Sequence, residues 1–252
     1  KARVYNGYNK AELDSELRFG PNIKDWPEME ALSENILLKV SSKILDEVTT
    51  TDELIPSGET SSYRSNPLGL AEFTLSRKDP AYVGRAKEVQ KAEAAREAGE
   101  EPYAVLPELK AAVDAIRTQF PDINEENTGI GSTIFAVKPG DGSAREQAAS
   151  CQKVLGGWAN IANEYATKRY RSNLINWGML PFIIKEGELP FANGDYLFVP
   201  EIRKAVEEKA PEVKAYAVKD GQLTEFSLTL GDLTDEEREI IRKGCLINYN
   251  RK

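Results

Sequence analysis

The hydrophobic and polar positions along the chain predict strands and helices that follow one another from about residue 35 onward. Residues 35–40 and residues 132–137 are short, apolar and partly β-branched runs, which is typical of buried strands. Between these runs, apolar side chains recur at helical spacing just before Pro121, which ends the helix they predict: Leu106, Leu109, Val113, Ile116 and Phe120.

The second half of the chain continues the alternation. A helix is predicted to begin at Ala144 and to end at Gly156 and Gly157, because glycine commonly terminates helices. A helix or turn is expected over residues 165–177. The other predicted strands are residues 158–161, 179–184, 197–199, 213–218 and 226–230, and the other helices lie near residues 200–209 and 234–244. This alternation predicts a layered α/β domain, without internal repeats.

Three segments do not fit the alternation. Residues 1–30 are polar and rich in glycine and proline, so we expect a linker between domains. Residues 49–64 combine Thr, Asp, Pro, Ser and Gly at a density typical of a loop. Residues 78–101 contain many Ala, Lys, Glu and Arg and few large apolar groups, which predicts an exposed helix or a flexible excursion. The chain starts at Lys1 rather than Met, so we expect it to be a fragment of a longer protein.

Charge and hydropathy argue against two classes of partner. Lys and Arg number 33 against 41 Asp and Glu, a net charge of −8, whereas nucleic-acid binding needs a basic surface. The only basic cluster, Lys168, Arg169 and Arg171, is small. No apolar run approaches the roughly 20 residues of a membrane span. Without such a span or a signal peptide, the chain is expected to be cytoplasmic.

The absence of histidine restricts the chemistry further. With 0 His, the chain cannot use a Ser-His-Asp triad, a histidine base or a histidine metal ligand. Its 2 cysteines, Cys151 and Cys245, cannot hold an iron–sulfur cluster alone, and we expect both to be buried and no metal to be bound by this chain. Any catalysis must therefore rely on hydroxyls, carboxylates, Arg and Lys.

The most informative local feature is the turn between the predicted strand at 132–137 and the helix from Ala144. Gly140 and Gly142 allow a tight turn, and the free N–H groups of a following helix would favour an anion, as would the guanidinium of Arg145. Ser143 followed three residues later by Glu146 also forms a capping-box pattern, which needs no ligand. The pattern alone favours simple capping.

Two further features have equally ordinary explanations. Asp52 and Arg64 lie in the loop at residues 49–64, where the expected arrangement is a salt-bridged turn. Residues 170–181 are expected to be a helix that stops at Gly178 before a strand.

Taken in order, the three features resemble the C-terminal swivel domain of the aconitase family. Asp52 and Arg64 keep the separation of the family's Thr-Thr-Asp loop and its following arginine. The resembling segments are Thr50-Thr51-Asp52-Glu53-Leu54-Ile55-Pro56-Ser57-Gly58, Gly142-Ser143-Ala144-Arg145-Glu146-Gln147, Ser172-Asn173-Leu174-Ile175-Asn176-Trp177-Gly178-Met179-Leu180-Pro181 and the tail Gly244-Cys245-Leu246-Ile247-Asn248. The resemblance covers residues 31–252, with an unmatched insertion at about 78–128. It implies a swivelling β/β/α arrangement, a small mixed sheet or barrel flanked by helices.

The resemblance also implies an activity. The implied activity is that of an iron–sulfur hydro-lyase acting on a hydroxy di- or tricarboxylate. Its [4Fe-4S] cluster would be held by earlier domains of the same chain, so this fragment alone is expected to be inactive. By position, the implied catalytic residues are Ser143 as the proton-transferring base, Asp52 as the acidic residue and Arg145, and the implied substrate-binding residues are Arg64, Arg145, Gly142 and Ala144.

The sequence departs from the family pattern at three positions, and these departures bear on the function. Ala144 stands where the family has a second serine, and Gln147 and Glu53 stand where it has histidines. These changes indicate a divergent hydratase rather than a housekeeping aconitase. They also favour an alternative, a degenerate swivel domain with a ligand-sensing or regulatory role. RNA binding is a third hypothesis and the weakest, because the net charge is −8.

Overall fold

The computed structural model describes residues 26, 28–60, 63, 65–143 and 146–251. Its centre is a seven-stranded mixed sheet in the order β6-β5-β3-β1-β7-β8-β9. The first four strands of this order run parallel, and the last three continue it in antiparallel pairs. The strands are β1 Asn35–Ile44, β3 Thr128–Ala136, β5 Gly157–Ala162, β6 Leu180–Ile183, β7 Tyr196–Val199, β8 Val213–Lys219 and β9 Gln222–Leu228. The sequence-predicted α/β class is confirmed, and each predicted strand overlaps one of these, although the last, predicted at 226–230, lies at 222–228.

The sheet curls until its two edges meet. Ile183 at the end of β6 pairs with Thr229, just after β9, through N–H···O bonds of 2.7 and 3.0 Å. The curled sheet encloses an apolar cluster that includes Ile36, Leu38, Phe182, Leu197 and Leu228, each at most 1% exposed. Closure gives hydrogen-bond partners to edges that would otherwise be open to other chains.

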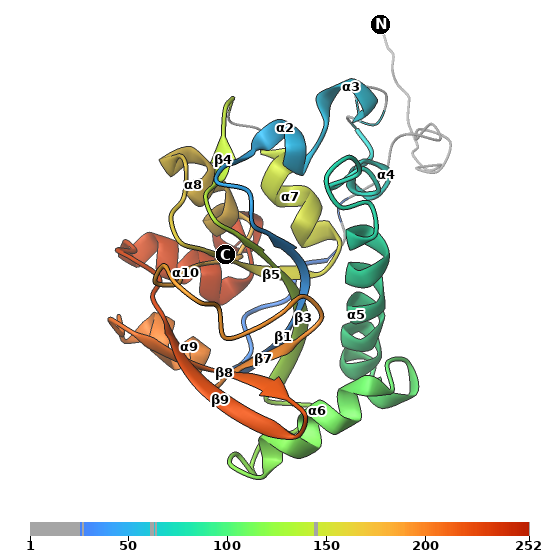
Figure 1. Ribbon diagram of the computed structural model, residues 1–252, viewed down its shortest axis with the longest axis vertical. Coiled ribbons are helices and arrows are strands. Elements are labelled where there is room, and N and C mark those ends of the chain that lie inside the picture. The colour runs from blue at the N-terminus through green and yellow to red at the C-terminus, as the bar shows by residue number, and fades with distance from the viewer. Residues whose placement is uncertain (1–25, 27, 61–62, 64, 144–145, 252) are drawn as a thin grey trace, which may run out of the picture.

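Helices cover the outside of this sheet (Figure 1). Leu37 lies between Ile36 and Leu38 in β1 but packs outward, because successive side chains of a strand point to opposite faces. There it meets α5 and α6, whereas α10 contacts both α8 and α9 elsewhere on the sheet. The helices with regular cores are α5 Tyr82–Glu97, α6 Glu108–Arg117, α7 Gln147–Val154, α8 Lys168–Asn176, α9 Ile202–Glu207 and α10 Asp235–Lys243. The predicted helices at 106–120, 165–177, 200–209 and 234–244 are thus confirmed.

Helix α5 corrects the expectation for residues 78–101. One side of it is buried rather than exposed: Tyr82, Ala86, Val89 and Ala92 are at most 1% accessible. Two of these four side chains are alanines, which let the helix backbone lie close to β1 and β3. A helix that packs through small residues lacks the large apolar stripe that sequence patterns detect.

The segment expected to be a loop at residues 49–64 contains short regular elements. β2 Thr49–Thr50 leads into α2 Thr51–Leu54, and α3 Ser57–Thr60 follows. Thr50 and Glu53 form a capping box, with bonds of 2.9 and 3.1 Å, that starts α2. The remaining short elements are α4 Pro67–Ala71, the 3-10 helix η2 Pro102–Ala104, β4 Pro139–Asp141 and α11 Leu246–Asn250.

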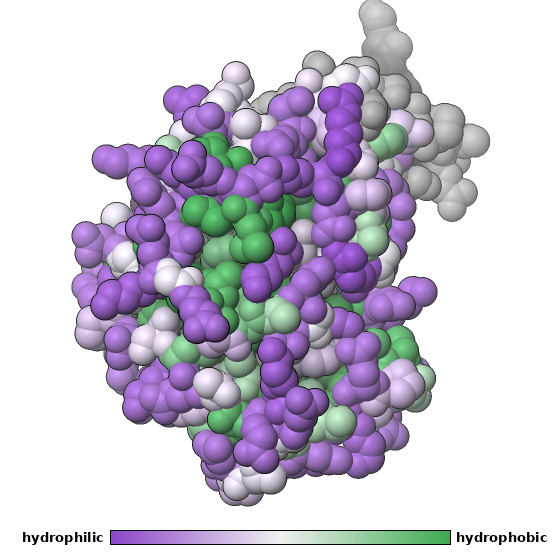
Figure 2. Space-filling view, viewed as in Figure 1, coloured by the Kyte–Doolittle hydropathy of each residue, from purple (hydrophilic) through white to green (hydrophobic). Residues whose placement is uncertain are grey.

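The outer surface is mainly polar. Figure 2 shows hydrophilic residues over most of the face in view, with apolar residues gathered near its centre. No helix among the described residues combines the length and apolar character that a membrane crossing requires.

Of the predicted linker at 1–30, residues 1–25 and 27 lie outside the described residues. Trp26 stacks on Trp177 with ring centroids 4.5 Å apart.

Candidate active site

A short two-stranded ribbon joins two of the motif loops. β2 and β4 pair in parallel, separately from the main sheet, with Thr49 opposite Pro139 and Thr50 opposite Asp141. Beyond the ribbon, Thr51 Oγ1 donates a 2.8 Å hydrogen bond to the backbone oxygen of Ser143, 92 residues away. In Figure 1, α2, β4 and α7 lie together at the top of the molecule. The ribbon therefore places the Asp52 loop beside the Ser143 loop.

The third motif segment, residues 170–181, packs against the same turn through Tyr170. Gly140 has a φ of +100°, and a Cβ there would lie 2.5 Å from the side chain of Tyr170 in α8. Thr167, the N-cap of α8, donates a 3.1 Å bond from Oγ1 to the oxygen of Gly140. Only glycine permits both this backbone conformation and this approach. The three segments singled out from the sequence thus meet at one place.

Ser143 is exposed and lies between β4 and α7, but it does not cap that helix. α7 begins at Gln147 rather than at Ala144, and Glu146 at its N-cap makes no side-chain capping bond. The predicted capping box of Ser143 and Glu146 is therefore wrong. β4 extends to Asp141, Gly142 has a φ of +102°, and the Ser143 carbonyl is held by Thr51, so the chain becomes helical only later.

Asp52 lies in α2 with its side chain 56% exposed. Its Oδ1 accepts 3.1 Å bonds from the backbone N–H and the hydroxyl of Ser57, and its Oδ2 lies 4.0 Å from a nitrogen of Arg77. The structure therefore places a salt-bridge partner at Asp52 that the sequence analysis missed. Arg77 follows no motif spacing, and only the fold brings it to the loop.

Three of the sequence-predicted site residues cannot be placed. Arg64, Ala144 and Arg145 lie outside the described residues. Gly142, the fourth predicted substrate-binding residue, is exposed beside Thr51, and a Cβ on it would lie 3.5 Å from Thr51 Oγ1.

Glu53, which stands where the resembling family has histidine, belongs to a charged cluster. Its carboxylate accepts a bond from the Thr50 N–H and lies 3.3 Å from the ammonium of Lys78, which also pairs with Asp46. The Thr50 N–H and Lys78 lower the pKa of Glu53, and the paired carboxylates raise the pKa of Lys78. The carboxylate of Glu53 thus holds the loop in shape.

The cavity closest in sequence to these motifs has a volume of about 280 Å³. It is lined by Trp26, Glu146, Asn173, Asn176, Trp177, Leu246 and Ile247. Since Ser143, Gly142 and Asp52 are themselves exposed, the site is open on the side of these residues.

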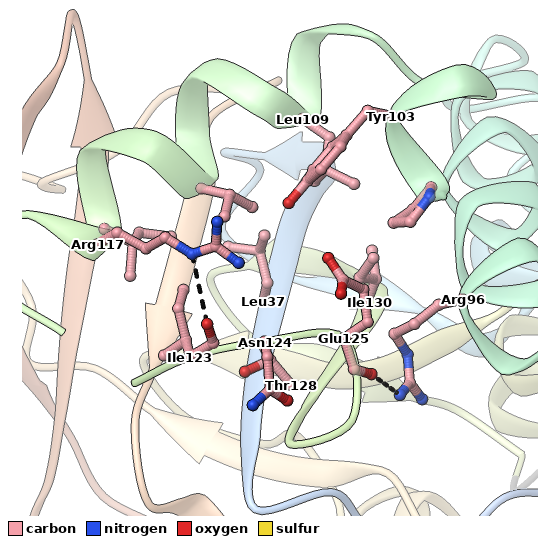
Figure 3. Close-up of a pocket in the computed structure, with 13 residues that line it drawn as sticks. Leu37, Arg96, Tyr103, Leu109, Arg117, Ile123, Asn124, Glu125, Thr128 and Ile130 are labelled. Carbon is pink, nitrogen blue, oxygen red and sulfur yellow. Dashed lines mark hydrogen bonds between the residues drawn. The ribbon is translucent and has the colours of Figure 1, made fainter. Parts of the chain in front are cut away.

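A second hollow, of about 30 Å³, lies under α6. Apolar and polar side chains line it, and the guanidinium of Arg117 and the hydroxyl of Tyr103 point into it (Figure 3). In Figure 1, α6 lies at the opposite end of the molecule from α2 and β4. This hollow therefore belongs to a different part of the fold from the motif residues.

The described residues do not fit a metal or an iron–sulfur cluster. Within this part of the chain, no group of three or more Cys, Asp or Glu side chains could hold a metal ion. Cys151 and Cys245 are each 1% exposed, as predicted, and Cys151 lies within α7. A cluster needs several accessible thiolates, which these two buried side chains do not supply.

Comparison with known proteins identifies part of the chain. Residues 90–187 match the family model of the aconitase C-terminal domain, a range that contains both the Ser143 loop and α8. No curated protein matches the chain. Among solved structures, 3-isopropylmalate dehydratase from Methanocaldococcus jannaschii is 20% identical, with a TM-score of 0.48, over 85% of this chain and 92% of that one.

Proposed function

We propose that this chain, whose residues 90–187 match the aconitase C-terminal domain, is a swivel domain of that family and supplies the proton-transfer half of a hydro-lyase site. The substrate would be a hydroxy di- or tricarboxylate. The observation that carries the proposal is the hydrogen bond from Thr51 to Ser143, which joins the Asp52 loop to the serine loop. Without it, the exposed serine would be one surface hydroxyl among many.

Ser143 is the proposed base that removes a carbon-bound proton from the substrate. A serine hydroxyl has a very high intrinsic pKa, so its anion needs cations and N–H donors nearby. The start of α7 offers backbone N–H groups without partners in the helix, and Arg145 would add a guanidinium. As Ser143 accepts the proton, the hydroxyl leaves the adjacent carbon; proton and hydroxide together make the released water.

The remaining residues would bind and orient the substrate. Arg64 and Arg145 are proposed to hold its carboxylates, because a guanidinium binds carboxylate through two parallel hydrogen bonds. Asp52 is proposed as the acidic residue of the site, and its bonds from Ser57 fix its orientation. Gly142 and Ala144 would form the surface against which the substrate lies.

The family's [4Fe-4S] cluster is assigned to another part of the parent protein, because the described residues of this chain do not fit it. When bound there, it would supply a Lewis acid for the leaving hydroxyl. The partners of this chain would be those cluster-bearing domains and the small-molecule substrate, in the cytoplasm, and the chain alone is expected to be inactive.

The test measures dehydration of a panel of hydroxy di- and tricarboxylates by the intact gene product, with its cluster reconstituted without oxygen. Ser143→Ala is expected to abolish both turnover and exchange of the substrate's carbon-bound proton with deuterated solvent. Ser227→Ala, on the exposed face of β9, is the matched control and should leave both unchanged.

Two outcomes would contradict the proposal. Turnover that persists in Ser143→Ala would remove the serine from its role as base. A cluster-loaded protein that binds a carboxylate but never dehydrates it would favour the ligand-sensing alternative, which should survive Ser143→Ala.

A further inference from the structure

A third cavity, of about 190 Å³, lies at the far end of α7 from Ser143. It is bounded by α5, by the end of α7 and by the segment before β1. Its lining residues are Glu28, Met29, Glu30, Gln90, Glu93, Ala94, Glu97, Lys153, Val154, Gly156 and Trp158. None of these belongs to the motif loops, so this cavity is independent of the proposed function.

Lys153 is the unusual group in this cavity. It is only 6% exposed, and its ammonium lies 4.6 Å from the ring centroid of Trp158. Among the residues that the structure describes, the ammonium makes no hydrogen bond or salt bridge. Burial lowers its pKa from 10.5 to about 8. The carboxylates of Glu93 and Glu30 act on this ammonium in the opposite direction, but neither lies within salt-bridge distance of it, so its N–H donors are available to an anionic group in the cavity.

The mouth of the same cavity carries an excess of carboxyl groups. Glu93 is already used, since its oxygens accept from Arg96 at 2.6 and 2.8 Å and from the N–H of Ile130 at 2.9 Å. Glu30 and Glu97 are exposed at the same cavity, and the guanidinium of Arg96 acts on them only at longer range than on Glu93. Desolvation and the neighbouring carboxyls of Glu30 and Glu93 raise the pKa of Glu97 to about 9, so at neutral pH Glu97 and Glu30 share a proton and carry one negative charge between them.

These charges exclude simple ligands. A molecule with only a negative charge would meet the glutamates, and one with only a positive charge would meet Lys153. The described residues also offer no group of three acidic or thiol ligands for a metal ion. A molecule that carries both charges can pair with the lysine and with the glutamates, and the volume restricts it to a few heavy atoms.

We propose that this cavity binds a small zwitterion, an amino acid, with its carboxylate on Lys153 and its ammonium on Glu30 and Glu97. The apolar groups of Met29, Val154 and Trp158 would contact its carbon chain. The pairing neutralises the buried lysine and the crowded glutamates at the same time.

The test is calorimetric titration of the chain with glycine, L-alanine, β-alanine and 4-aminobutyrate, a series in which the distance between the charges increases. Propionate and propylamine, which carry one charge each, are the control ligands. At least one amino acid is expected to bind at least tenfold more tightly than either control. The best spacing then measures the distance between the two charge sites.

Variants locate the site. Lys153→Met keeps the length and apolar contacts of the side chain without its charge, and it is expected to weaken binding at least tenfold. Glu30→Gln, which removes the negative charge that Glu30 and Glu97 share, should weaken it by a similar factor. Glu100→Gln, also exposed but just beyond the end of α5, is the matched control and should have no effect.

Three results would overturn the proposal. The first is that no amino acid binds at millimolar concentration. The second is that propionate or propylamine binds as tightly as the amino acids. The third is that Lys153→Met, with a circular dichroism spectrum like that of the wild type, binds the amino acid unchanged. The first would indicate that water fills the cavity.

Discussion

The two ends of α7 place polar groups in opposite environments. At its start, Ser143 and the neighbouring motif residues are exposed, held in position by backbone bonds and glycine turns. At its end, Lys153 is buried against Trp158. The contacts around Ser143 fix its position, but its hydroxyl stays in water unless another molecule or domain covers the loop. At Lys153, desolvation is provided by the chain itself, at a cost in stability. The proposed catalytic group therefore depends on a covering partner, and the lysine does not.

The largest expected effect is a difference in turnover between variants at the two ends of α7. In the cluster-loaded parent protein, Ser143→Ala is expected to lower turnover by about 10³-fold or more, the scale seen when a catalytic group is removed. Lys153→Met is expected to change it by less than about twofold, because the lysine lies outside the motif loops. Steady-state rates on the best substrate measure both. An equal loss in the two variants would mean that the ends are coupled.

The next effect tests how the serine loop is held. Gly140→Ala is expected to lower the free energy of unfolding by about 3 kcal/mol, because it combines a positive φ with a clash against Tyr170. Gly194→Ala is the matched control: its φ is +93°, and nothing lies within 4 Å of the added Cβ. It should cost about 1 kcal/mol. Urea unfolding of both variants gives the difference, and equal values would remove the role assigned to Tyr170.

Lys153→Met is expected to stabilise the chain by about 2 kcal/mol at pH 7. Lowering the pKa from 10.5 to about 8 corresponds to a penalty of about 3 kcal/mol, of which about 1 is offset by the contact with Trp158. Below pH 8 the lysine is charged in both states, so the native state carries the full penalty. As pH rises from 8 to 10.5, the native lysine loses its proton first, and the penalty disappears.

The measurement is urea unfolding at pH 7 and pH 10, with Lys91→Met, an exposed lysine of α5, as the control. The gain should shrink at the higher pH in Lys153→Met only. A gain of the same size at both pH values would show that it arises from packing rather than from charge.

The smallest effect concerns the bond between the two motif loops. Thr51→Val removes the hydroxyl that donates to Ser143 and keeps the shape of the side chain. We expect a loss of about 1 kcal/mol in stability, a typical value for one hydrogen bond, and a fall in kcat larger than any change in KM. Thermal unfolding and steady-state kinetics measure the two effects. A change in KM alone would indicate that the bond supports binding rather than the position of Ser143.

The sequence predicts the strands well and the contacts between loops poorly. Runs such as residues 35–40 and 132–137 are recognisable because a buried strand needs consecutive apolar side chains. α5 was expected to be exposed because alanine can pack tightly without a large apolar group. Ser143 and Glu146 have the spacing of a capping box, but the ribbon of β2 and β4 keeps the chain extended as far as Asp141, and α7 begins only at Gln147.

The meeting of the motif loops could be expected only from the family resemblance. Nothing in the spacing of Thr51 and Ser143 requires that they touch, since the pairing of β2 with β4 depends on the intervening sheet. Arg77 and Lys153 were missed for a related reason. The salt bridge of Arg77 and the cavity beside Lys153 are formed by residues distant in the sequence, so the local sequence cannot predict them.

The pairing of Ile183 with Thr229 also determines when the fold can be completed during synthesis. β6, which follows the motif helix α8, has a free edge until residue 229 has left the ribosome. Until then the nascent chain presents a strand that any neighbouring polypeptide could extend. A ribosome that pauses between these two residues would therefore expose the chain to aggregation at the strand closest to its own motif helix.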